Sequence, residues 1–279
     1  MKITYLGTGA AEGIPALFCN CKYCTEVRRR GGKEIRSRAQ VLIDGELSLD
    51  FPPDAFYHAA VFGAEFSAVK YLLVTHSHMD HFYASDFVLR GYKYALNPVS
   101  LTLDIYGNAE VLEVFEESTR REIKPEVKEH IRLHELKPFE RATFGGYTVH
   151  PLRAQHSSRE PLLFLIEKDG KRVLHLADTG RLPEESLAYL KEQGGAPLDL
   201  VTLDCTFVWG ETKQNARHMG LDEAMRTIAS LKEIALVDGH TKKVITHFSH
   251  NSAPSKKTLK KAEREYGVIA AYDGLTLNI

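Results

Sequence analysis

The stretch Val69-Lys70-Tyr71-Leu72-Leu73-Val74-Thr75, followed by His76-Ser77-His78-Met79-Asp80-His81, carries the strongest structural signal in the sequence. Its first part is mostly apolar or β-branched, which predicts a buried strand that ends at His76. Because side chains alternate along an extended backbone, His76 and His78 point the same way and can bind one metal ion. We expect Asp80 and His81 to face a second ion. A solvated polar loop is the alternative, but this spacing directly after a buried strand favours a metal site.

Further candidate ligands follow other apolar strands of the chain. Asp178 comes just after Leu176, and His247 just after Ile245, so the strand ends of one sheet edge would bring them together. A carboxylate has two oxygens, which makes Asp178 a candidate bridge between two ions. We expect His156 to complete the first ion's ligands and His247 the second's. The competing candidates are His150, His175 and Asp204, of which His175 lies inside an apolar run and is expected to be structural.

These ligands suit more than one metal. Imidazole and carboxylate groups bind zinc, manganese and iron alike, so the sequence predicts two divalent ions without choosing between them. Two such ions close together hold and deprotonate a bridging water and also bind the oxygens of a phosphoryl group.

The composition is that of an ordinary globular protein. Of 279 residues, 43% are hydrophobic and 26% charged. The formal net charge of -1 argues against a strongly basic nucleic-acid surface, although a local basic patch can exist within a neutral total. No apolar run is long enough to span a bilayer, and the first residues lead straight into a strand, so we expect a cytoplasmic protein.

The pattern of strands and helices predicts a layered α/β arrangement in a single domain spanning residues 1–279. Expected strands cover residues 2–6, 39–44, 46–50, 69–75, 101–106, 198–203 and 243–246, with several more between 131 and 176 and one or two between 270 and 277. Expected helices cover residues 53–61, 109–120, 184–193, 221–232 and 255–266. Residues 84–96 are expected to form a helix or a lid.

Three cysteines lie close together near the N-terminus. Cys19, Cys21 and Cys24 have the spacing of three thiolate ligands of one tetrahedral zinc ion, with a fourth ligand from elsewhere. Reduced, buried thiols are the alternative. Cys205 follows an apolar strand and is expected to be an ordinary buried thiol.

At its histidine run, and at His156, Asp178 and His247 in order, the sequence resembles the metallo-β-lactamase superfamily over nearly the whole chain. This resemblance implies an αββα sandwich of two mixed sheets flanked by helices, with the metals at one edge. The segment from Leu6 to Pro15, together with the cysteines, is similar to the cyclic-phosphate phosphodiesterases of the carbon–phosphorus lyase pathway and their relatives. That similarity implies a structural zinc ion whose fourth ligand is His250.

The resemblance also implies a role for His218. Phosphodiester-cleaving branches of the superfamily carry a histidine in the setting of His218, just before a helix. The resemblance implies that His218 donates a proton to the leaving oxygen or holds the phosphate, and we expect Asp80 to orient it. A histidine without a role at the start of a helix is the alternative.

The predicted function is therefore a metal-dependent phosphodiesterase that cleaves a small, anionic cyclic phosphodiester through a metal-bridging hydroxide. The alternatives are an RNA-processing nuclease resembling ribonuclease Z and a cofactor-synthesis or carrier protein resembling PqqB. Nucleic acid is the less favoured partner, no membrane partner is expected, and a homodimer stays open.

Two other features are read as structural. The glycine loop from Gly7 to Gly13 is interpreted as a tight turn rather than a phosphate cradle. The basic stretch from Arg28 to Arg38 is interpreted as a solvated face that can steer an anionic substrate.

Overall fold

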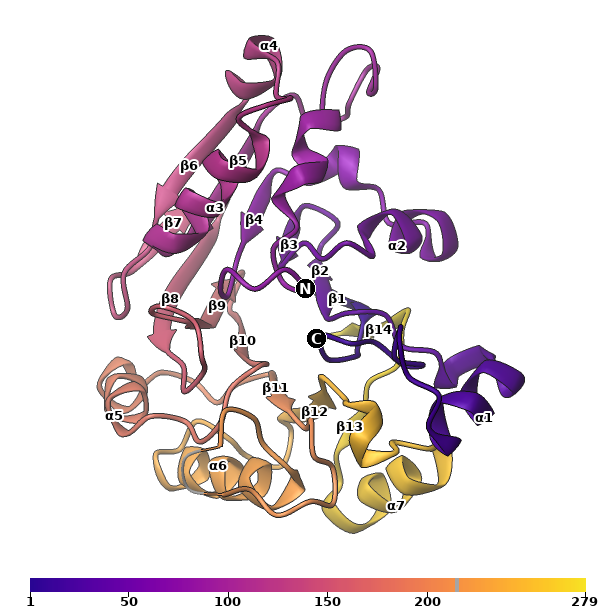
Figure 1. Cartoon of the computed structure of the whole chain (residues 1–279). Helices are drawn as coiled ribbons and strands as arrows, with labels where there is room; N and C mark the ends of the chain where they lie inside the picture. Colours follow the sequence, from indigo (N-terminus) through magenta and orange to yellow (C-terminus); the bar gives the residue numbers. More distant parts are fainter. Residues whose placement is uncertain (214–215) are drawn as a thin grey trace.

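Two seven-stranded sheets form the centre of the molecule (Figure 1). The computed structural model describes residues 1–213 and 216–279. The first sheet has the order β14-β1-β2-β3-β4-β5-β6, and the second has the order β13-β12-β11-β10-β9-β8-β7. The strands of the first sheet are β1 Lys2–Gly7, β2 Gln40–Ile43, β3 Leu47–Leu49, β4 Tyr71–Leu73, β5 Leu103–Gly107, β6 Ile131–Glu135 and β14 Leu275–Asn278. Those of the second are β7 Ala142–Phe144, β8 Tyr147–Arg153, β9 Leu162–Lys168, β10 Lys171–Leu176, β11 Leu200–Asp204, β12 Lys242–Thr246 and β13 Ile269–Ala270.

Both sheets are mixed. In the first, β14, β1, β2 and β3 pair antiparallel, whereas β3, β4, β5 and β6 pair parallel. In the second, β7 to β10 pair antiparallel and β10 to β13 pair parallel. The parallel strands of each sheet therefore end at one edge, and the loops that follow them can meet there.

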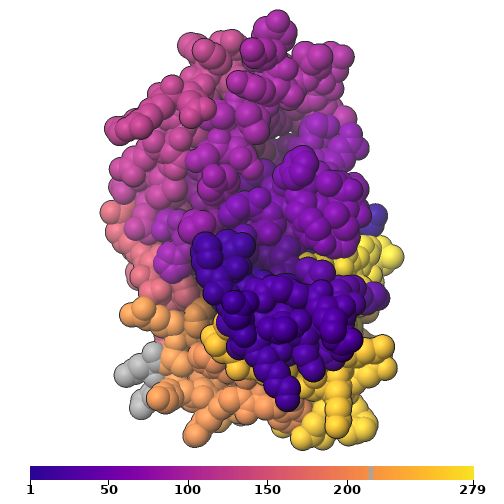
Figure 2. All heavy atoms as spheres, turned by 45° about the vertical axis from the view of Figure 1, so that its right-hand side comes forward, coloured from indigo at the N-terminus to yellow at the C-terminus, as the bar shows by residue number. Residues whose placement is uncertain are grey.

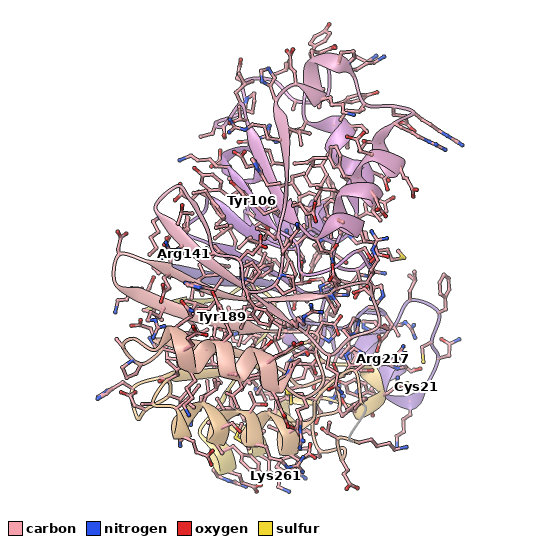
Figure 3. The ribbon with its side chains drawn as sticks, turned by 90° about the vertical axis from the view of Figure 1, so that its left-hand side faces the viewer. Cys21, Tyr106, Arg141, Tyr189, Arg217 and Lys261 are labelled. Carbon is pink, nitrogen blue, oxygen red and sulfur yellow. The ribbon has the colours of Figure 1, made fainter. Side chains whose placement is uncertain are left out.

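Helices cover the outer face of each sheet. They are α1 Lys22–Arg30, α2 Ala55–Phe62, α3 Ala109–Thr119, α4 Pro125–Lys128, α5 Glu184–Gln193, α6 Leu221–Glu233 and α7 Lys256–Tyr266, with short 3-10 turns at Gly32–Glu34, Phe66–Ala68, Ala84–Leu89 and His250–Ser252. Figure 3 marks the layers with Tyr106 in the first sheet and Tyr189 on α5 outside the second.

Three clusters of buried apolar side chains correspond to the three layer contacts. Tyr5, Leu49 and Phe164 belong to the cluster between the sheets. A second cluster joins the second sheet to α5, α6 and α7, and a third joins the first sheet to α3. This is the αββα arrangement expected from the sequence.

Most expected elements occur within a few residues of their expected bounds. The N-cap of α7 is Ser255, whose hydroxyl accepts from the amide of Thr258, as the sequence indicated. Two elements differ. Helix α1 occupies the cysteine and arginine segment, which has too few buried positions to show a helical pattern, namely Cys24 and Val27. In the segment 84–96, expected to form a helix or a lid, only Ala84–Leu89 is helical, as a 3-10 turn.

Glycine lets the N-terminal segment lie close to its neighbours. A Cβ on Gly7 would lie 1.9 Å from the carbonyl oxygen of Arg38. Gly9 forms bridges to Arg38 and to Phe248, the residue after His247. The glycine loop is thus a tight structural turn. Figure 2 shows indigo atoms of the N-terminal part on the surface beside yellow atoms of the C-terminal part. Within residues 1–213 and 216–279, every helix is too short or too polar to cross a bilayer.

Candidate metal centre

The candidate ligands lie at or just beyond the carboxyl ends of β4, β8, β10, β11 and β12. Strands β10, β11 and β12 are parallel neighbours, so Asp178, Asp204 and His247 emerge at the same sheet edge. The run from His76 to His81 emerges from β4 of the facing sheet. The strand pattern of the sequence therefore leads directly to one shared site.

A first group of ligand atoms belongs to His76, His78, His156 and Asp178, and these atoms lie within 4.8 Å of one another. The Nε2 of His76 is 3.0 Å from the Nδ1 of His78, which is 3.2 Å from the Nε2 of His156. The Oδ2 of Asp178 is 3.3 Å from the Nε2 of His76. The structure thus brings together the residues expected for the first ion.

A second group belongs to Asp80, His81, Asp178 and His247, again within 4.8 Å. The Nε2 of His81 is 3.2 Å from the Oδ2 of Asp80 and 3.1 Å from the Oδ2 of Asp178. The Nε2 of His247 is 3.7 Å from that same Asp178 oxygen. Asp178 is the residue that the two groups share, as expected of a bridging carboxylate.

The donor atoms fit a pair of cations. The Nε2 atoms of His81 and His247 and the Oδ1 of Asp178 are buried, and among the described residues none has a hydrogen-bond partner. The Nδ1 of His218 lies 2.9 Å from that oxygen, but without the alignment of a hydrogen bond. Buried polar atoms that face one another without hydrogen bonds are costly unless another group, such as a metal ion, satisfies them.

Burial and neighbouring charges shift the pKa values of Asp178 and His156 toward the forms that bind metal. Burial would raise the pKa of the Asp178 carboxyl, but the surrounding imidazoles, His247 first among them, hold it well below its usual range. Burial lowers the pKa of His156 to about 4, so this imidazole is neutral at pH 7 and able to bind a metal.

His218 lies against two carboxylates, and neither is Asp80. Its Nδ1 is 2.9 Å from the Oδ1 of Asp178 and 3.4 Å from the Oδ2 of Asp204. Burial by itself would lower the pKa of His218, but these two carboxylates raise it to about 10. The expectation that Asp80 orients His218 is wrong, because Asp80 faces His81 in the second group. The orienting acids are Asp178 and Asp204.

Asp204, a competing candidate in the sequence, also holds the loop that carries His218. Its Oδ1 accepts from the amides of Thr206 and Met219. Its Oδ2 is 3.4 Å from the Nδ1 of His247. Asp204 therefore positions one residue from each end of the loop after β11.

Asp50 is the functional candidate that the sequence analysis missed. It lies at the end of β3, and its Oδ2 is 2.7 Å from the Nδ1 of His81. Its Oδ1 accepts from the amide of Thr75, whose hydroxyl is 3.0 Å from the Nδ1 of His76. On the other sheet the hydroxyl of Thr206 lies 2.9 Å from the Nδ1 of His247. The sequence feature that could have identified Asp50 is its position directly after an apolar strand. The same kind of position identified Asp178.

Replacing Asp50 with Asn is expected to weaken metal binding by about 10- to 100-fold, because partners that fix the tautomer and orientation of a histidine ligand contribute that much. Competition with a chromogenic chelator measures this. Asp54→Asn is the matched control, since Asp54 forms an ion pair with Arg38 outside the site. Equal metal affinity in the two variants would exclude an orienting role for Asp50.

The backbone at the site adopts unusual conformations. Asp50, Asp178 and His247 have φ angles of 62°, 56° and 61°, in the left-handed region. Such residues are uncommon and gather at functional sites, where the surrounding contacts offset a cost of about 1–3 kcal/mol each. Gly180 allows a close approach here, because a Cβ on it would lie 1.9 Å from the carbonyl oxygen of Ala216.

The cysteine cluster forms a separate group with His250. Sulfur atoms of Cys19, Cys21 and Cys24 and a ring nitrogen of His250 lie within 4.8 Å of one another. The Nδ1 of His250 is 3.3 Å from the Sγ of Cys24 and 3.8 Å from the Sγ of Cys21. A hydrogen bond from the Cys24 amide and the contact with His250 lower the pKa of the Cys21 thiol to about 6, which favours a thiolate ligand. All four cysteines of the chain are free thiols.

Replacing Cys21 with Ser is expected to remove one zinc ion per chain and to lower the melting temperature by about 5–10 °C. This corresponds to a loss of about 2–3 kcal/mol for a chain of this size. Atomic absorption and thermal unfolding measure the two effects. Cys205→Ser, in the core outside the cluster, should keep the zinc content unchanged. Unchanged zinc content in Cys21→Ser would contradict a cysteine-bound zinc ion.

The remaining candidates have structural roles. His175 is buried in β10, and burial lowers its pKa to about 4. The ring of His150 contacts the hydroxyl of Tyr189 and the carboxylate of Glu167. The basic stretch is not uniformly solvated, because Arg36 is buried and its guanidinium donates to Thr8 and to the carbonyl oxygen of Ala271.

A comparison with known protein families agrees with this geometry. The model of the β-lactamase superfamily domain matches residues 40–248, which include both groups of candidate ligands and His218. The chain belongs to the metallo-β-lactamase superfamily. Members of this superfamily are mostly metal-dependent hydrolases.

Solved structures share the fold at low sequence identity. A diphosphatase of the PhnP family is 21% identical with a TM-score of 0.71, covering 99% of this chain and 97% of that one. Zinc-bound PqqB from Methylobacterium extorquens is 18% identical with a TM-score of 0.76, covering 100% of both chains. The short form of human tRNase Z is 17% identical with a TM-score of 0.70, covering 100% and 99%.

A curated relative is a longer protein. An octanoyltransferase of Porphyromonas gingivalis (strain ATCC BAA-308 / W83) is 25% identical over 283 residues, covering 99% of this chain. The chain spans about half, 51%, of that relative's length.

Proposed function

We propose that this member of the superfamily is a phosphodiesterase that uses two divalent metal ions, zinc, manganese or iron, on a small cyclic phosphodiester. The observation that carries the proposal is the position of Asp178. Its Oδ2 faces His76 and His81, one from each ligand group, and its Oδ1 faces His218 and His156. A protonated imidazole next to the shared carboxylate can act as a general acid toward the leaving oxygen of a phosphate ester.

Each ion would be held by one of the two ligand groups. His76, His78 and His156 would hold one, Asp80, His81 and His247 the other, and Asp178 both. When bound, such a pair activates water and neutralises charge on the phosphoryl oxygens. Asp50, Thr75 and Thr206 keep the imidazole rings in place by contacts to their Nδ1 atoms.

His218 supplies the proton for the leaving oxygen. Its Nδ1 is engaged by Asp178 and Asp204, which keep the ring charged. Its side chain is 27% exposed, whereas those of Asp178, Asp204 and His247 are 3%, 0% and 2% exposed. Of these four side chains, the ring of His218 is thus the one that a substrate can most readily reach.

A small diester is favoured by the cysteine cluster and by the PhnP-family likeness. The N-terminal segment with Cys19, Cys21 and Cys24 lies beside the site, through the bridge between Gly9 and Phe248. That neighbour is named a diphosphatase, a name that indicates hydrolysis of a phosphate compound. We propose that a structural zinc ion in this cluster fixes the segment next to the substrate.

A second candidate, hydrolysis of a medium-chain acyl thioester, comes from the octanoyltransferase relative. An apolar pocket of about 210 Å³ is lined by Phe51, Phe66, Leu72 and Phe87, among others. The amide of Phe51 donates to the carbonyl oxygen of His81, so the pocket wall adjoins a candidate ligand. A proton donor between two carboxylates is more useful for a poor alkoxide leaving group than for a thiolate, which favours the phosphodiester.

One assay separates the candidates. The purified protein, with manganese or zinc, is tested on bis(p-nitrophenyl) phosphate, 2′,3′-cyclic nucleotides, a precursor tRNA and an octanoyl thioester. Turnover of the cyclic nucleotides that exceeds turnover of the tRNA and the thioester is expected. The absence of turnover on every diester would overturn the proposal.

A further inference from the structure

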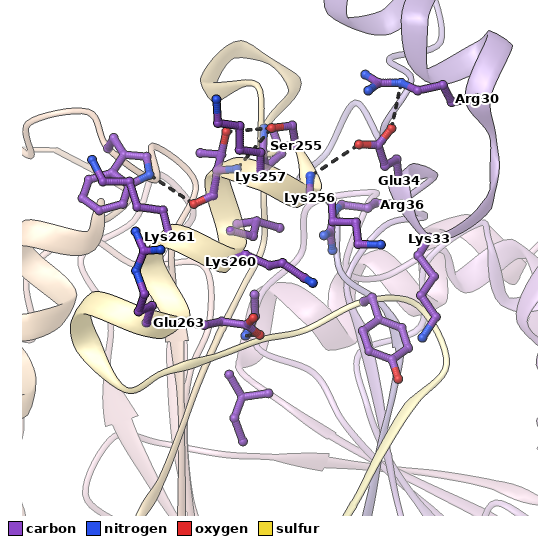
Figure 4. A pocket seen from close by; sticks show the side chains of 18 of the residues that line it. Arg30, Lys33, Glu34, Arg36, Ser255, Lys256, Lys257, Lys260, Lys261 and Glu263 are labelled. Atoms are coloured by element: carbon purple, nitrogen blue, oxygen red, sulfur yellow. Dashed lines mark hydrogen bonds and ion pairs between the residues drawn. The ribbon is translucent and has the colours of Figure 1, made fainter.

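A second surface of the molecule is strongly basic. A groove of about 1450 Å³ lies between α7 and the segment of α1 and the following 3-10 turn (Figure 4). Five of its lining residues are cations of α7: Lys256, Lys257, Lys260, Lys261 and Arg264. These cations line one concave surface, whereas the lysines of an ordinary solvated face are scattered.

The opposite wall adds more positive charge. Arg30, Lys33 and the buried Arg36 line it, and among the described lining residues only Glu34 and Glu263 are acidic. Figure 4 shows the side chains of Lys256 and Lys260 extending from α7 and that of Lys33 lying on the opposite wall. In a chain whose formal net charge is -1, this concentration of one sign is large.

Much of this charge lacks an internal partner. Within residues 1–213 and 216–279, Lys33, Lys256 and Lys260 have no carboxylate oxygen within the 4.0 Å of an ion pair. Glu34 is engaged by Arg30, at 3.0 Å, and by the amide of Lys256. Cations that converge without neutralisation repel one another, and an anionic ligand would relieve that repulsion.

Aromatic rings accompany the cations. Trp209 and Tyr272 both line the groove, and Trp209 is 39% exposed. The ammonium of Lys261 lies 4.3 Å from the Trp209 ring centre, and that of Lys33 lies 3.6 Å from that of Tyr272. Basic grooves with interspersed aromatic rings are typical of surfaces that bind single-stranded nucleic acid.

The groove adjoins the elements of the metal centre. Trp209 belongs to the loop after β11 that carries His218, and its indole donates to the carbonyl oxygen of Thr258 on α7. The guanidinium of Arg36 lies 4.5 Å from the ring centre of Phe248, the residue after His247. A ligand in the groove would therefore contact Trp209, in the loop that carries His218, and Arg36, which lies against the residue after His247.

We infer that this groove binds single-stranded nucleic acid through its phosphates and bases. Its volume exceeds the roughly 300–1,000 Å³ of small-molecule pockets, which favours an extended ligand over a single phosphate. Its exposed indole favours a ligand with stackable bases over an acidic polypeptide. Binding is independent of turnover, so the inference does not rest on the proposed function.

Fluorescence anisotropy with a labelled 2′-O-methyl RNA of about 15 nucleotides tests the inference. The groove variant is Lys256→Glu with Lys260→Glu, two exposed positions one turn apart on α7. We expect it to bind about tenfold or more weakly than the wild-type chain and to lower the slope of log affinity against log salt by about 1.4.

The matched control is Lys124→Glu with Lys137→Glu, which changes the charge equally at exposed lysines outside the groove. It should bind RNA like the wild-type chain, and thermal melting checks that both variants fold. Absence of RNA binding by the wild-type chain, or equal binding by the groove variant, would overturn the inference. So would competition by poly-glutamate, or by phosphatidylserine vesicles, that matches competition by unlabelled RNA.

Discussion

Replacing Asp178 with Asn is expected to lower turnover of a phosphodiester by about a thousandfold or more and to remove at least one of the two active-site ions, while the zinc ion of the cysteine cluster stays bound. Its carboxylate faces His76 at 3.3 Å and His81 at 3.1 Å, so an amide would lose the charge that both ligand groups share. The loss of several kcal/mol of stabilisation of the phosphoryl charge corresponds to that rate effect. Turnover of bis(p-nitrophenyl) phosphate and metal analysis measure the two outcomes.

Asp169→Asn is a close control for this variant. Asp169 has a φ of 51°, near the 56° of Asp178, so both positions place an aspartate in the left-handed region. Asn tolerates this conformation as well as Asp does, and Asp169 lies in the turn between β9 and β10, outside the site. The control variant should keep full activity. If Asp178→Asn retained the full metal content of the wild-type chain and wild-type turnover, the shared carboxylate would have no bridging role.

The sequence predicts which candidate ligands the structure groups together, because the signal for each of them is local. A polar ligand directly after an apolar strand can be recognised without knowing the partner strand, as at His76, Asp178 and His247. The sheet order then places these residues together, since β10, β11 and β12 are parallel neighbours. The layered α/β arrangement follows from the alternation of strands and helices, whereas the sandwich of two mixed sheets is implied by the resemblance to the superfamily.

What the sequence does not predict depends on contacts between distant segments. Asp50 follows a short strand at the end of a hairpin, and only the parallel pairing of β3 with β4 brings it to His81. The pairing of His218 with Asp178 and Asp204, instead of Asp80, depends on the path of the loop after β11. The basic groove joins residues more than 200 positions apart, such as Lys33 and Lys256, so neither segment alone indicates it.

Replacing His218 with Ala is expected to lower kcat by about 100- to 1,000-fold while the metal content stays normal. General acid catalysis contributes an effect of this size, and no ligand of the two groups is removed. Metal analysis and steady-state kinetics on a cyclic nucleotide measure both quantities. His240→Ala, at an exposed histidine outside the metal groups, is the control. It should leave both kcat and metal content unchanged.

The leaving group decides how His218 acts. A proton donor matters most for a basic alkoxide and little for p-nitrophenolate, which leaves without a proton. We therefore expect His218→Ala to lose much more activity on a cyclic nucleotide than on bis(p-nitrophenyl) phosphate. A residue that only holds the phosphate would instead raise KM, or lower kcat equally for both substrates. Equal losses on the two substrates would assign His218 to phosphate binding, and its contacts with Asp178 and Asp204 would then serve to keep the ring charged.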